Sequence, residues 1–144
     1  MKTLIGALAL SLMTLPAFAE GDAAAGAKVF QKCQTCHAMV NEAGEVVAGK
    51  GAKTGPNLYG LPGRVAGSVE GFKYGDDMLA LGATGFQWGE ADFVAYVADP
   101  SKFLQEKLSD SKARGKMMFK LPKADDAANV WAYIASLSPA PAAP

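Results

Sequence analysis

The sequence predicts an all-α fold in a single domain. Several segments repeat apolar residues at the three- and four-residue spacing of one helix face, whereas convincing strand patterns are hard to find. Aspartate or proline stands where several of these segments begin, as both residues often do at helix N-termini. The chain has 144 residues and no internal repeat, a length that suits one compact domain.

The first helix is predicted to begin after Asp22, whose carboxylate can cap it, and to run to Cys33. Its apolar face would hold Val29, Phe30 and Cys33. Gly26 lies inside this helix, where glycine costs about 1 kcal/mol relative to alanine. The missing side chain at Gly26 would allow another helix to cross closely.

Residues 39–71 are rich in glycine and are interrupted by Pro56 and Pro62, which predicts ordered loop rather than regular structure. A short helix is predicted over residues 76–81. A longer helix is predicted over residues 90–98, because apolar side chains recur there at helical spacing. These side chains are Phe93, Val94 and Val97.

Asp99 and Pro100 are predicted to be the N-cap and the first-turn proline of a further helix, which continues through Leu108. Pro122 is predicted to open the last helix in the same way. The apolar face of that helix would consist of Val130, Trp131, Ile134 and Leu137. Residues 138–144 contain mainly alanine and proline and are predicted to form a disordered tail.

Residues 1–19 indicate export. A basic start at Lys2 precedes an apolar stretch over residues 4–13, which is too short to span a bilayer. An Ala-Phe-Ala cleavage site ends at Ala19, so Glu20 would be the first mature residue. The sequence therefore predicts a cleaved signal peptide and a periplasmic protein without a membrane anchor. An uncleaved anchor is the competing interpretation.

The charge balance is close to neutral, and its distribution is more informative than its sum. The formal net charge is zero, and removal of the signal peptide takes away one lysine, which leaves about −1. This total gives no indication of nucleic-acid binding. Basic residues flank a cysteine motif and cluster around a pair of methionines, Met117 and Met118. They are Lys28, Lys32, Lys112, Arg114, Lys116, Lys120 and Lys123. An ordinary solvated surface is the alternative explanation.

The cysteine motif is the most informative part of the chain. Cys33, Cys36 and His37 form a C-x-x-C-H sequence, and the chain has no other cysteine or histidine. This spacing is the signature of covalent c-type haem attachment. Each cysteine sulfur adds to one haem vinyl group, and the adjacent imidazole binds the iron as the proximal ligand.

Other interpretations of C-x-x-C are a redox dithiol of thioredoxin type, half of a zinc site, or a plain disulfide. A structural zinc site needs four ligands, and the chain has too few cysteines and histidines to supply them. A thiol–disulfide oxidoreductase stays open as an alternative, although its motif usually opens a helix that follows a strand.

The second axial ligand of a haem iron cannot be histidine here, because His37 is the only one. Met117 and Met118 lie in a stretch bounded by Gly115 and Pro122, far enough along the chain to reach the distal side. A thioether ligand raises the reduction potential. Met39 is too close to His37 in sequence, and Met78 would be a core residue or a pocket wall. Lys112 and Lys116 are further alternatives.

The chain resembles the class I cytochromes c, most closely their long-loop bacterial form, the c-two type. The resemblance covers Gly21 to Leu137. It rests on the cysteine motif together with Gly26-Ala27-Lys28-Val29-Phe30, Thr54-Gly55-Pro56-Asn57-Leu58-Tyr59-Gly60, Gly63-Arg64, Gly71-Phe72-Lys73-Tyr74, Trp88 and Gly115-Lys116-Met117-Met118-Phe119. It implies that residues 20–137 form a class I cytochrome c fold, in which a few helices and ordered loops surround one haem.

The resemblance also implies roles for individual residues. Met117 would be the axial methionine, and Phe119 would lie beside the exposed haem edge. The carbonyl of Pro56 would accept from His37 and so orient its ring. Arg64, Tyr74 and Trp88 would bind the haem propionates, and Tyr96 would lie near the methionine sulfur. Gly26 and Phe30 would pack against Val130 and Tyr133.

The implied function is that of a soluble, monomeric electron carrier and not of an enzyme. The donor would be a quinol-oxidising bc complex of a respiratory or photosynthetic chain. The acceptor would be a photosynthetic reaction centre, a terminal oxidase or a periplasmic reductase, each bound through a basic face at the haem edge. A haem peroxidase or gas-binding sensor with an open sixth site is the alternative within haem proteins.

Two positions depart from the family pattern. Gly115 stands where the family often has a hydroxyl, two residues before the axial methionine. Met78 replaces a polar residue near the propionates. Both changes make the pocket less polar, which predicts a modestly altered potential rather than a different ligand set.

Overall fold

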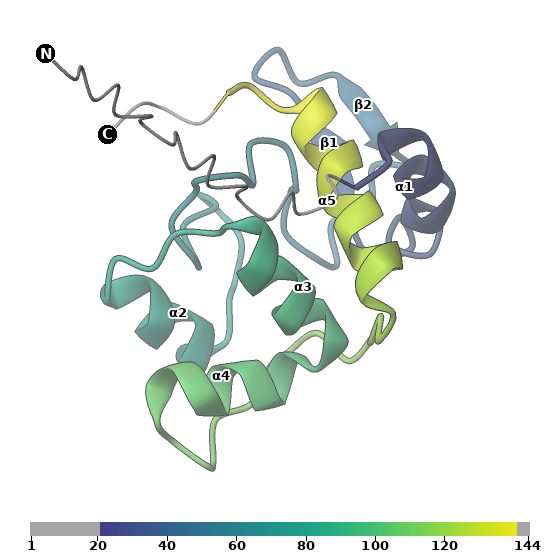
Figure 1. Ribbon diagram of the computed structural model, residues 1–144. Helices are drawn as coiled ribbons and strands as arrows, with labels where there is room; N and C mark the ends of the chain where they lie inside the picture. The colour runs from purple at the N-terminus through teal and green to yellow at the C-terminus, as the bar shows by residue number, and fades with distance from the viewer. Residues whose placement is uncertain (1–20, 141–144) are drawn as a thin grey trace, which may run out of the picture.

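The computed structural model describes residues 21–140, so the predicted signal peptide lies outside the described residues. Within this range the chain forms five helices and one small sheet (Figure 1). The elements are α1 (Ala23–Phe30), β1 (Ala38–Val40), β2 (Val46–Gly49), α2 (Asp76–Ala83), α3 (Glu90–Ala98), α4 (Pro100–Leu108) and α5 (Ala124–Leu137). None of these helices combines the length and hydrophobicity that crossing a membrane requires.

Helices α1 and α5 lie side by side and join the two ends of the domain (Figure 1). A Cβ atom on Gly26 would overlap the backbone carbonyl of Asn129 and would lie 2.9 Å from the Cβ of Tyr133. The ring of Phe30 meets that of Tyr133 edge to face, with 5.4 Å between the centroids. The prediction that a second helix crosses at Gly26 is therefore confirmed, and the close approach explains why glycine is needed there.

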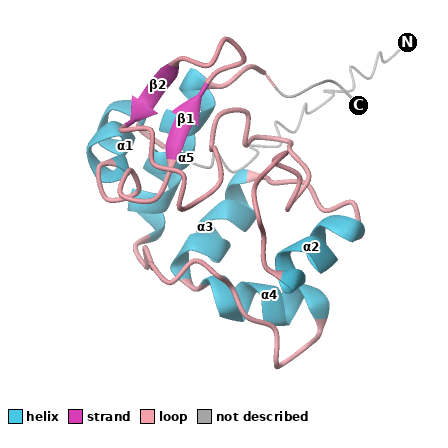
Figure 2. Ribbon diagram, turned by 180° about the vertical axis from the view of Figure 1, so that it is seen from behind, coloured by secondary structure: helices cyan, strands magenta, loops and turns pink. Residues whose placement is uncertain are grey.

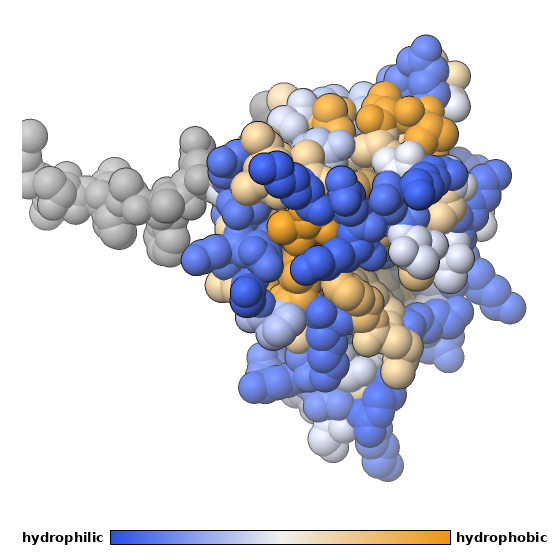
Figure 3. Space-filling model, turned by 90° about the vertical axis from the view of Figure 1, so that its right-hand side faces the viewer, coloured by the Kyte–Doolittle hydropathy of each residue, from blue (hydrophilic) through white to orange (hydrophobic). Residues whose placement is uncertain are grey.

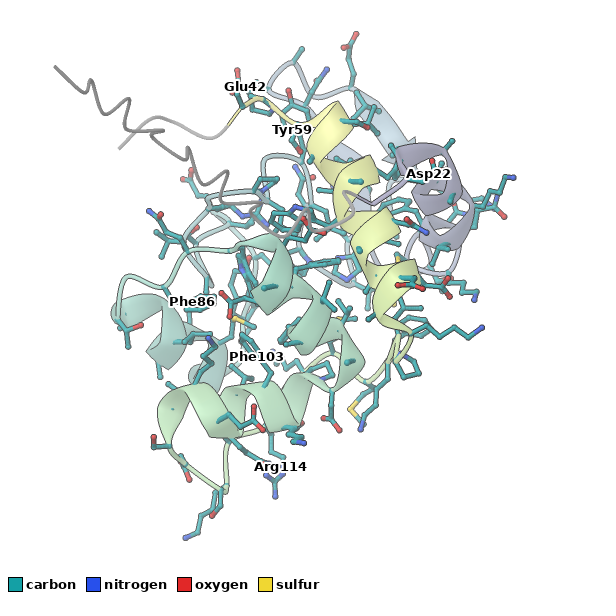
Figure 4. The ribbon with its side chains drawn as sticks, in the orientation of Figure 1. Asp22, Glu42, Tyr59, Phe86, Phe103 and Arg114 are labelled. Carbon is teal, nitrogen blue, oxygen red and sulfur yellow. The ribbon has the colours of Figure 1, made fainter. Side chains whose placement is uncertain are left out.

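Helices α2, α3 and α4 form the other half of the domain. The carboxylate of Asp99 accepts a hydrogen bond from the backbone N–H of Lys102 at 3.1 Å, and Pro100 stands in the first turn of α4, as predicted. Between α3 and α4 lies an aromatic cluster, in which Trp88 stacks on Phe103 with 5.9 Å between the ring centroids. Phe86 and Phe103 point toward this region in Figure 4. Phe93 of α3 contacts Trp131 of α5 and connects the two halves.

The small sheet corrects the prediction that residues 39–71 are loop throughout. Strands β1 and β2 pair antiparallel, and their connecting turn is closed by Asn41, whose side-chain oxygen accepts from the N–H groups of Ala43 and Glu45. Met39 and Ala48 are buried on this hairpin. Strands of three and four residues are too short to show an alternating pattern, which is why no strand was predicted here. The rest of this region is loop (Figure 2).

Three helix boundaries differ from the predictions. Helix α1 ends at Phe30, because the N–H groups of Lys32 and Cys33 bond three residues back in tighter turns. Helix α2 extends to Ala83, two residues past the predicted end. Helix α5 begins at Ala124 after an N-cap at Lys123, so Pro122 precedes the helix and is not its first residue.

The predicted tail begins at Ser138, which the structure describes, whereas residues 141–144 lie outside the described range. The hydroxyl of Ser138 donates to the carbonyl of Ile134 and accepts from the N–H of Gly60, both within 2.9 Å. The first residue of the tail therefore connects the end of α5 to the long loop.

Candidate functional site

The cysteine motif forms a compact turn directly after α1. The N–H of Cys36 donates to the carbonyl of Cys33 at 3.1 Å, and the N–H of His37 donates to the same carbonyl at 3.0 Å. Helical turns of this kind place residues three and four apart on one side of the chain. The local sequence therefore directs the cysteines and the histidine toward a common region.

The loop that follows the sheet fixes the imidazole of His37. Its Nδ1 lies 2.8 Å from the carbonyl oxygen of Pro56, which can only accept, so Nδ1 carries the proton and Nε2 keeps its lone pair. This contact confirms the expectation drawn from the family resemblance. Burial lowers the pKa of His37, the hydrogen bond to Pro56 raises it, and the charge of Arg64 lowers it. A neutral imidazole with a free Nε2 is the form that binds a metal.

Gly55, next to Pro56 in the chain, also lies against the imidazole. A Cβ atom at this position would lie 2.6 Å from Nδ1 and 2.7 Å from Nε2 of His37, well inside ordinary contact distance. The N–H of Gly55 also donates to the carbonyl of Cys36 at 2.7 Å. The loop backbone therefore lies against the ring. The only signal for Gly55 in the sequence is its place beside Pro56.

Cys33, His37 and Met117 line the same cavity, which has a volume of about 210 Å³. Its other walls come from the long loop and from α2, α3, α4 and α5. Apolar side chains dominate these walls, namely Leu58, Leu61, Phe72, Met78, Trp88, Phe93, Val97, Leu104 and Val130. Cys36 is half-buried in the turn and is not among the residues that line the cavity.

The four methionines of the described chain differ sharply in their surroundings. Met117 is half-buried and lines the cavity, whereas the side chain of Met118 is 86% exposed. Met39 is completely buried in the core, away from the cavity lining. Met78 is buried and forms part of the cavity wall, so the structure places a second sulfur near the site.

Polar side chains also reach the cavity. Arg64, Tyr74, Trp88 and Tyr96 line it together, as the family resemblance implies. The guanidinium of Arg64 donates to the carbonyl of Tyr59 at 3.0 Å, and burial lowers its pKa. Burial raises the pKa of Tyr74 and raises that of Tyr96 to about 12. Both hydroxyls are therefore neutral hydrogen-bond donors at physiological pH.

This arrangement fits a covalently attached haem. An apolar cavity contains a thiol and a neutral imidazole with its Nε2 free, and it also contains a thioether. Arg64 still has several N–H groups beyond the one bonded to Tyr59, and a guanidinium pairs well with carboxylates such as propionates. The residues present therefore match both the iron and the acidic side groups of the cofactor.

The alternatives for the cysteine pair fit less well. Burial raises the pKa of the Cys33 thiol to about 11, although Lys32 lowers it. Such a thiol stays protonated at neutral pH, whereas thiol–disulfide exchange needs a thiolate. Cys33 also follows the C-terminal end of α1 rather than a helix N-terminus. In the described chain no group of three His, Cys, Asp or Glu residues is arranged to hold a metal ion.

Basic residues gather at one side of the cavity. Arg114 and Lys116 line it beside Met117, and so does Lys73, which was not among the basic residues expected there. The Nζ of Lys116 donates to the carbonyl of Lys73 at 3.1 Å across this side. Lys120 instead pairs with Asp99 at 2.6 Å, so its charge is partly neutralised.

Gly115, one of the two departures from the family pattern, has a structural explanation. A Cβ atom on Gly115 would lie 2.8 Å from the Cβ of Pro100 at the start of α4. Any side chain there would therefore push the methionine segment away from the helix. A hydroxyl is nevertheless present, because Oγ of Ser101 accepts from the N–H of Gly115 at 3.0 Å.

Comparison with known proteins gives a consistent result. The chain is 61% identical over 123 residues to a cytochrome c2 of Fuscovulum blasticum, covering 85% of this chain and 78% of that protein. It is 52% identical over 145 residues to a cytochrome c2 of Cereibacter sphaeroides, covering 98% and 100%. A crystal structure of cytochrome c2 from Rhodobacter sphaeroides superposes with a TM-score of 0.82 at 54% identity, covering 85% of this chain and all of that one.

Models of known protein families gave no match to the chain. The relatives above are nevertheless far more similar than is needed to establish kinship, and they agree with the fold and with the cavity. The chain belongs to the cytochrome c2 family of class I c-type cytochromes, which are electron carriers rather than enzymes and hold one covalently attached haem.

Proposed function

We propose that this protein carries single electrons through the periplasm between membrane redox complexes. The donor is a quinol-oxidising bc complex, and the acceptor is a photosynthetic reaction centre, a terminal oxidase or a periplasmic reductase. One observation carries this proposal: Cys33, His37 and Met117 line a single apolar cavity, with His37 held by the carbonyl of Pro56. When bound there, a haem supplies one-electron chemistry between its ferrous and ferric states.

Four residues hold the cofactor in this proposal. Cys33 and Cys36 form the two thioether bonds. His37 binds the iron through Nε2, because its Nδ1 is already committed to Pro56. Met117, which lines the same cavity, would supply its sulfur as the second ligand, a role that its neighbour Met118 is too exposed to fill.

The surroundings of these ligands suit electron transfer rather than catalysis. With His37 and Met117 both bound to the metal, no position would remain at which a substrate or a gas could bind it, which argues against a peroxidase or a sensor. The apolar walls exclude water and limit the reorganisation that accompanies a change of charge. The soft thioether of Met117 favours the reduced state and raises the potential.

A docking face is proposed at the side of the cavity where Met117 enters. Phe119 is 41% exposed there, next to the exposed Met118, and Lys73, Arg114 and Lys116 line this side. Hydrophilic residues surround smaller apolar patches on the face shown in Figure 3. Basic side chains around an apolar centre would attract an acidic partner, and association would weaken as salt is added.

Location in the periplasm and maturation complete the proposal. Residues 1–19 direct export and are removed, so the mature chain begins at Glu20 and meets its cofactor outside the cytoplasm. Mass spectrometry of the purified protein checks both steps. The expected mass is that of residues 20–144 plus one haem, without thiols that can be alkylated.

Replacement of Met117 tests the ligand set. In Met117→Ala, we expect the oxidised protein to lose the weak red absorption band typical of sulfur bound to ferric haem. Cyanide should then bind readily, and the reduction potential should fall. Met118→Ala is the matched control, because it removes the same side chain one residue further on and should leave all three properties unchanged.

Two outcomes of this experiment would contradict the proposal. If Met118→Ala loses the band instead, the methionine segment is shifted by one residue from the arrangement described. If neither variant loses it, Met78 is the remaining sulfur that lines the cavity, and Met78→Ala should be the variant that does.

A further inference from the structure

The segment that carries Met117 is fastened to the helical half of the domain just before the methionine. The N–H of Arg114 donates to Oδ2 of Asp77 at 2.7 Å, and the N–H of Gly115 donates to Oγ of Ser101 at 3.0 Å. Asp77 lies in the first turn of α2, and Ser101 lies in the first turn of α4. Two side chains from different helices therefore bind two successive amides of an irregular loop.

We propose that Asp77 and Ser101 are positioning residues for the axial methionine. They hold residues 114 and 115 so that Met117 enters the cavity, and their loss would let its sulfur leave the iron more often. This inference rests on the proposed ligation by Met117 and extends it. It assigns no direct contact with the cofactor to either residue.

The hydrogen-bonding pattern along the segment supports this role. Among the described residues, the backbone N–H groups of residues 116 to 120 make no hydrogen bond, and the next anchor is Leu121, whose N–H donates to the carbonyl of Val97 at 2.7 Å. The backbone amides around Met117 are thus hydrogen-bonded only at the two ends of this span, although the side chains of Lys116 and Lys120 contact Lys73 and Asp99. The bound amide of Gly115 is only two residues from Met117, whereas that of Leu121 is four residues away. The Gly115 end therefore has the stronger control over where the sulfur of Met117 lies.

Helix α4 contacts the same segment in two further ways. Nε2 of Gln105 donates to the carbonyl of Ala113 at 3.1 Å. The backbone of Gly115 approaches Pro100 so closely that a Cβ atom would lie 2.8 Å away. The close approach of Gly115 to Pro100 lets the hydroxyl of Ser101 reach the N–H of Gly115. It also leaves the methionine segment little freedom to move while the amides of Arg114 and Gly115 are bound.

Variants of Ser101 provide the first test. Alanine is the better helix former, so Ser101→Ala should not weaken α4 itself. We nevertheless expect cyanide to bind the oxidised holoprotein roughly tenfold faster, because one hydrogen bond is worth about a factor of ten in an equilibrium constant. Ser101→Thr keeps the hydroxyl and should restore slow binding. Ser136→Ala, which removes a helical hydroxyl from α5, is the matched control and should leave the rate unchanged.

Variants of Asp77 test the second contact. Asp77→Asn keeps an oxygen that can accept from Arg114, whereas Asp77→Ala does not. We therefore expect Asp77→Ala to raise the rate of cyanide binding between about threefold and tenfold, with Asp77→Asn close to the original protein. Asp76→Ala is the control, because it removes the same charge from the same first turn of α2.

Amide hydrogen exchange in the unaltered holoprotein gives a readout that needs no variant. The N–H groups of Arg114 and Gly115 should exchange roughly tenfold more slowly than those of residues 116 to 120. Equal exchange rates would overturn the inference, and so would Ser101→Ala and Asp77→Ala behaving like their controls. Failure of the ligation itself would be seen separately, as slow cyanide binding in Met117→Ala.

Discussion

Gly55→Ala is the most direct test of how the loop supports His37. The added Cβ would lie 2.6 Å from Nδ1, whereas ordinary contacts begin near 3.4 Å, so the ring has to move by close to an ångström. Overpacking of this kind costs about 1–3 kcal/mol. The moved ring also loses its hydrogen bond to Pro56, worth about 1 kcal/mol. We expect the free energy of unfolding of the holoprotein to fall by about 2–4 kcal/mol.

The assay is chemical denaturation of the oxidised holoprotein, followed by circular dichroism and by the visible spectrum of the cofactor. Gly89→Ala is the matched control, because Gly89 also has an ordinary backbone conformation and no atom lies within 4 Å of its added Cβ. Gly89 is the N-cap of α3, so its replacement should cost no more than about 1 kcal/mol. If Gly55→Ala unfolds like the control and keeps an unchanged spectrum, then the loop does not brace the imidazole.

Two further predictions concern stability. Gly26→Ala should lower the urea concentration at the midpoint of unfolding, because the added Cβ would overlap the backbone of Asn129. This loss should outweigh the helix propensity of alanine, which favours the variant by about 1 kcal/mol. A higher midpoint would show that α1 and α5 can separate without penalty. Asp99 accepts hydrogen bonds from the side chain of Lys120 and the backbone of Lys102, and both lower the pKa of its carboxyl group. The ionised carboxylate therefore stabilises the fold at neutral pH. This contribution is lost as the pH falls below about 3.9 and the group becomes protonated. Asp99→Asn keeps the cap but not the charge, and its stability should depend less on pH in that range; an identical pH profile would contradict this assignment.

Local signals account for the parts of the fold that were predicted correctly. Helices α3 and α4 begin and end as expected, because apolar spacing, the carboxylate of Asp99 and the ring of Pro100 act within one or two turns. The same local chemistry explains why the motif around His37 indicates the cofactor. Interactions over short stretches of chain can be deduced from short stretches of sequence.

Two parts of the fold were missed, one because it is short and one because it depends on a contact between distant segments. The hairpin of β1 and β2 is too short to show alternation. The start of α5 was displaced by two residues because Leu121 is buried and bound to Val97, which keeps the chain extended past Pro122. Neither feature leaves a periodic pattern that could be recognised in advance.

The amino-acid sequence by itself determined the chemistry of this protein: two thiols and one imidazole at a spacing that suits a single cofactor, and methionines as the available second ligand. The family resemblance could only imply which methionine is used, whereas the tertiary structure places Met117 at the cavity and leaves Met118 exposed. Met117 and Met118 are chemically identical neighbours, and in the proposed arrangement Asp77 of α2 and Ser101 of α4 bind the amides just before them and so set the direction of the chain. That direction results from packing between residues far apart in sequence, which no local pattern records.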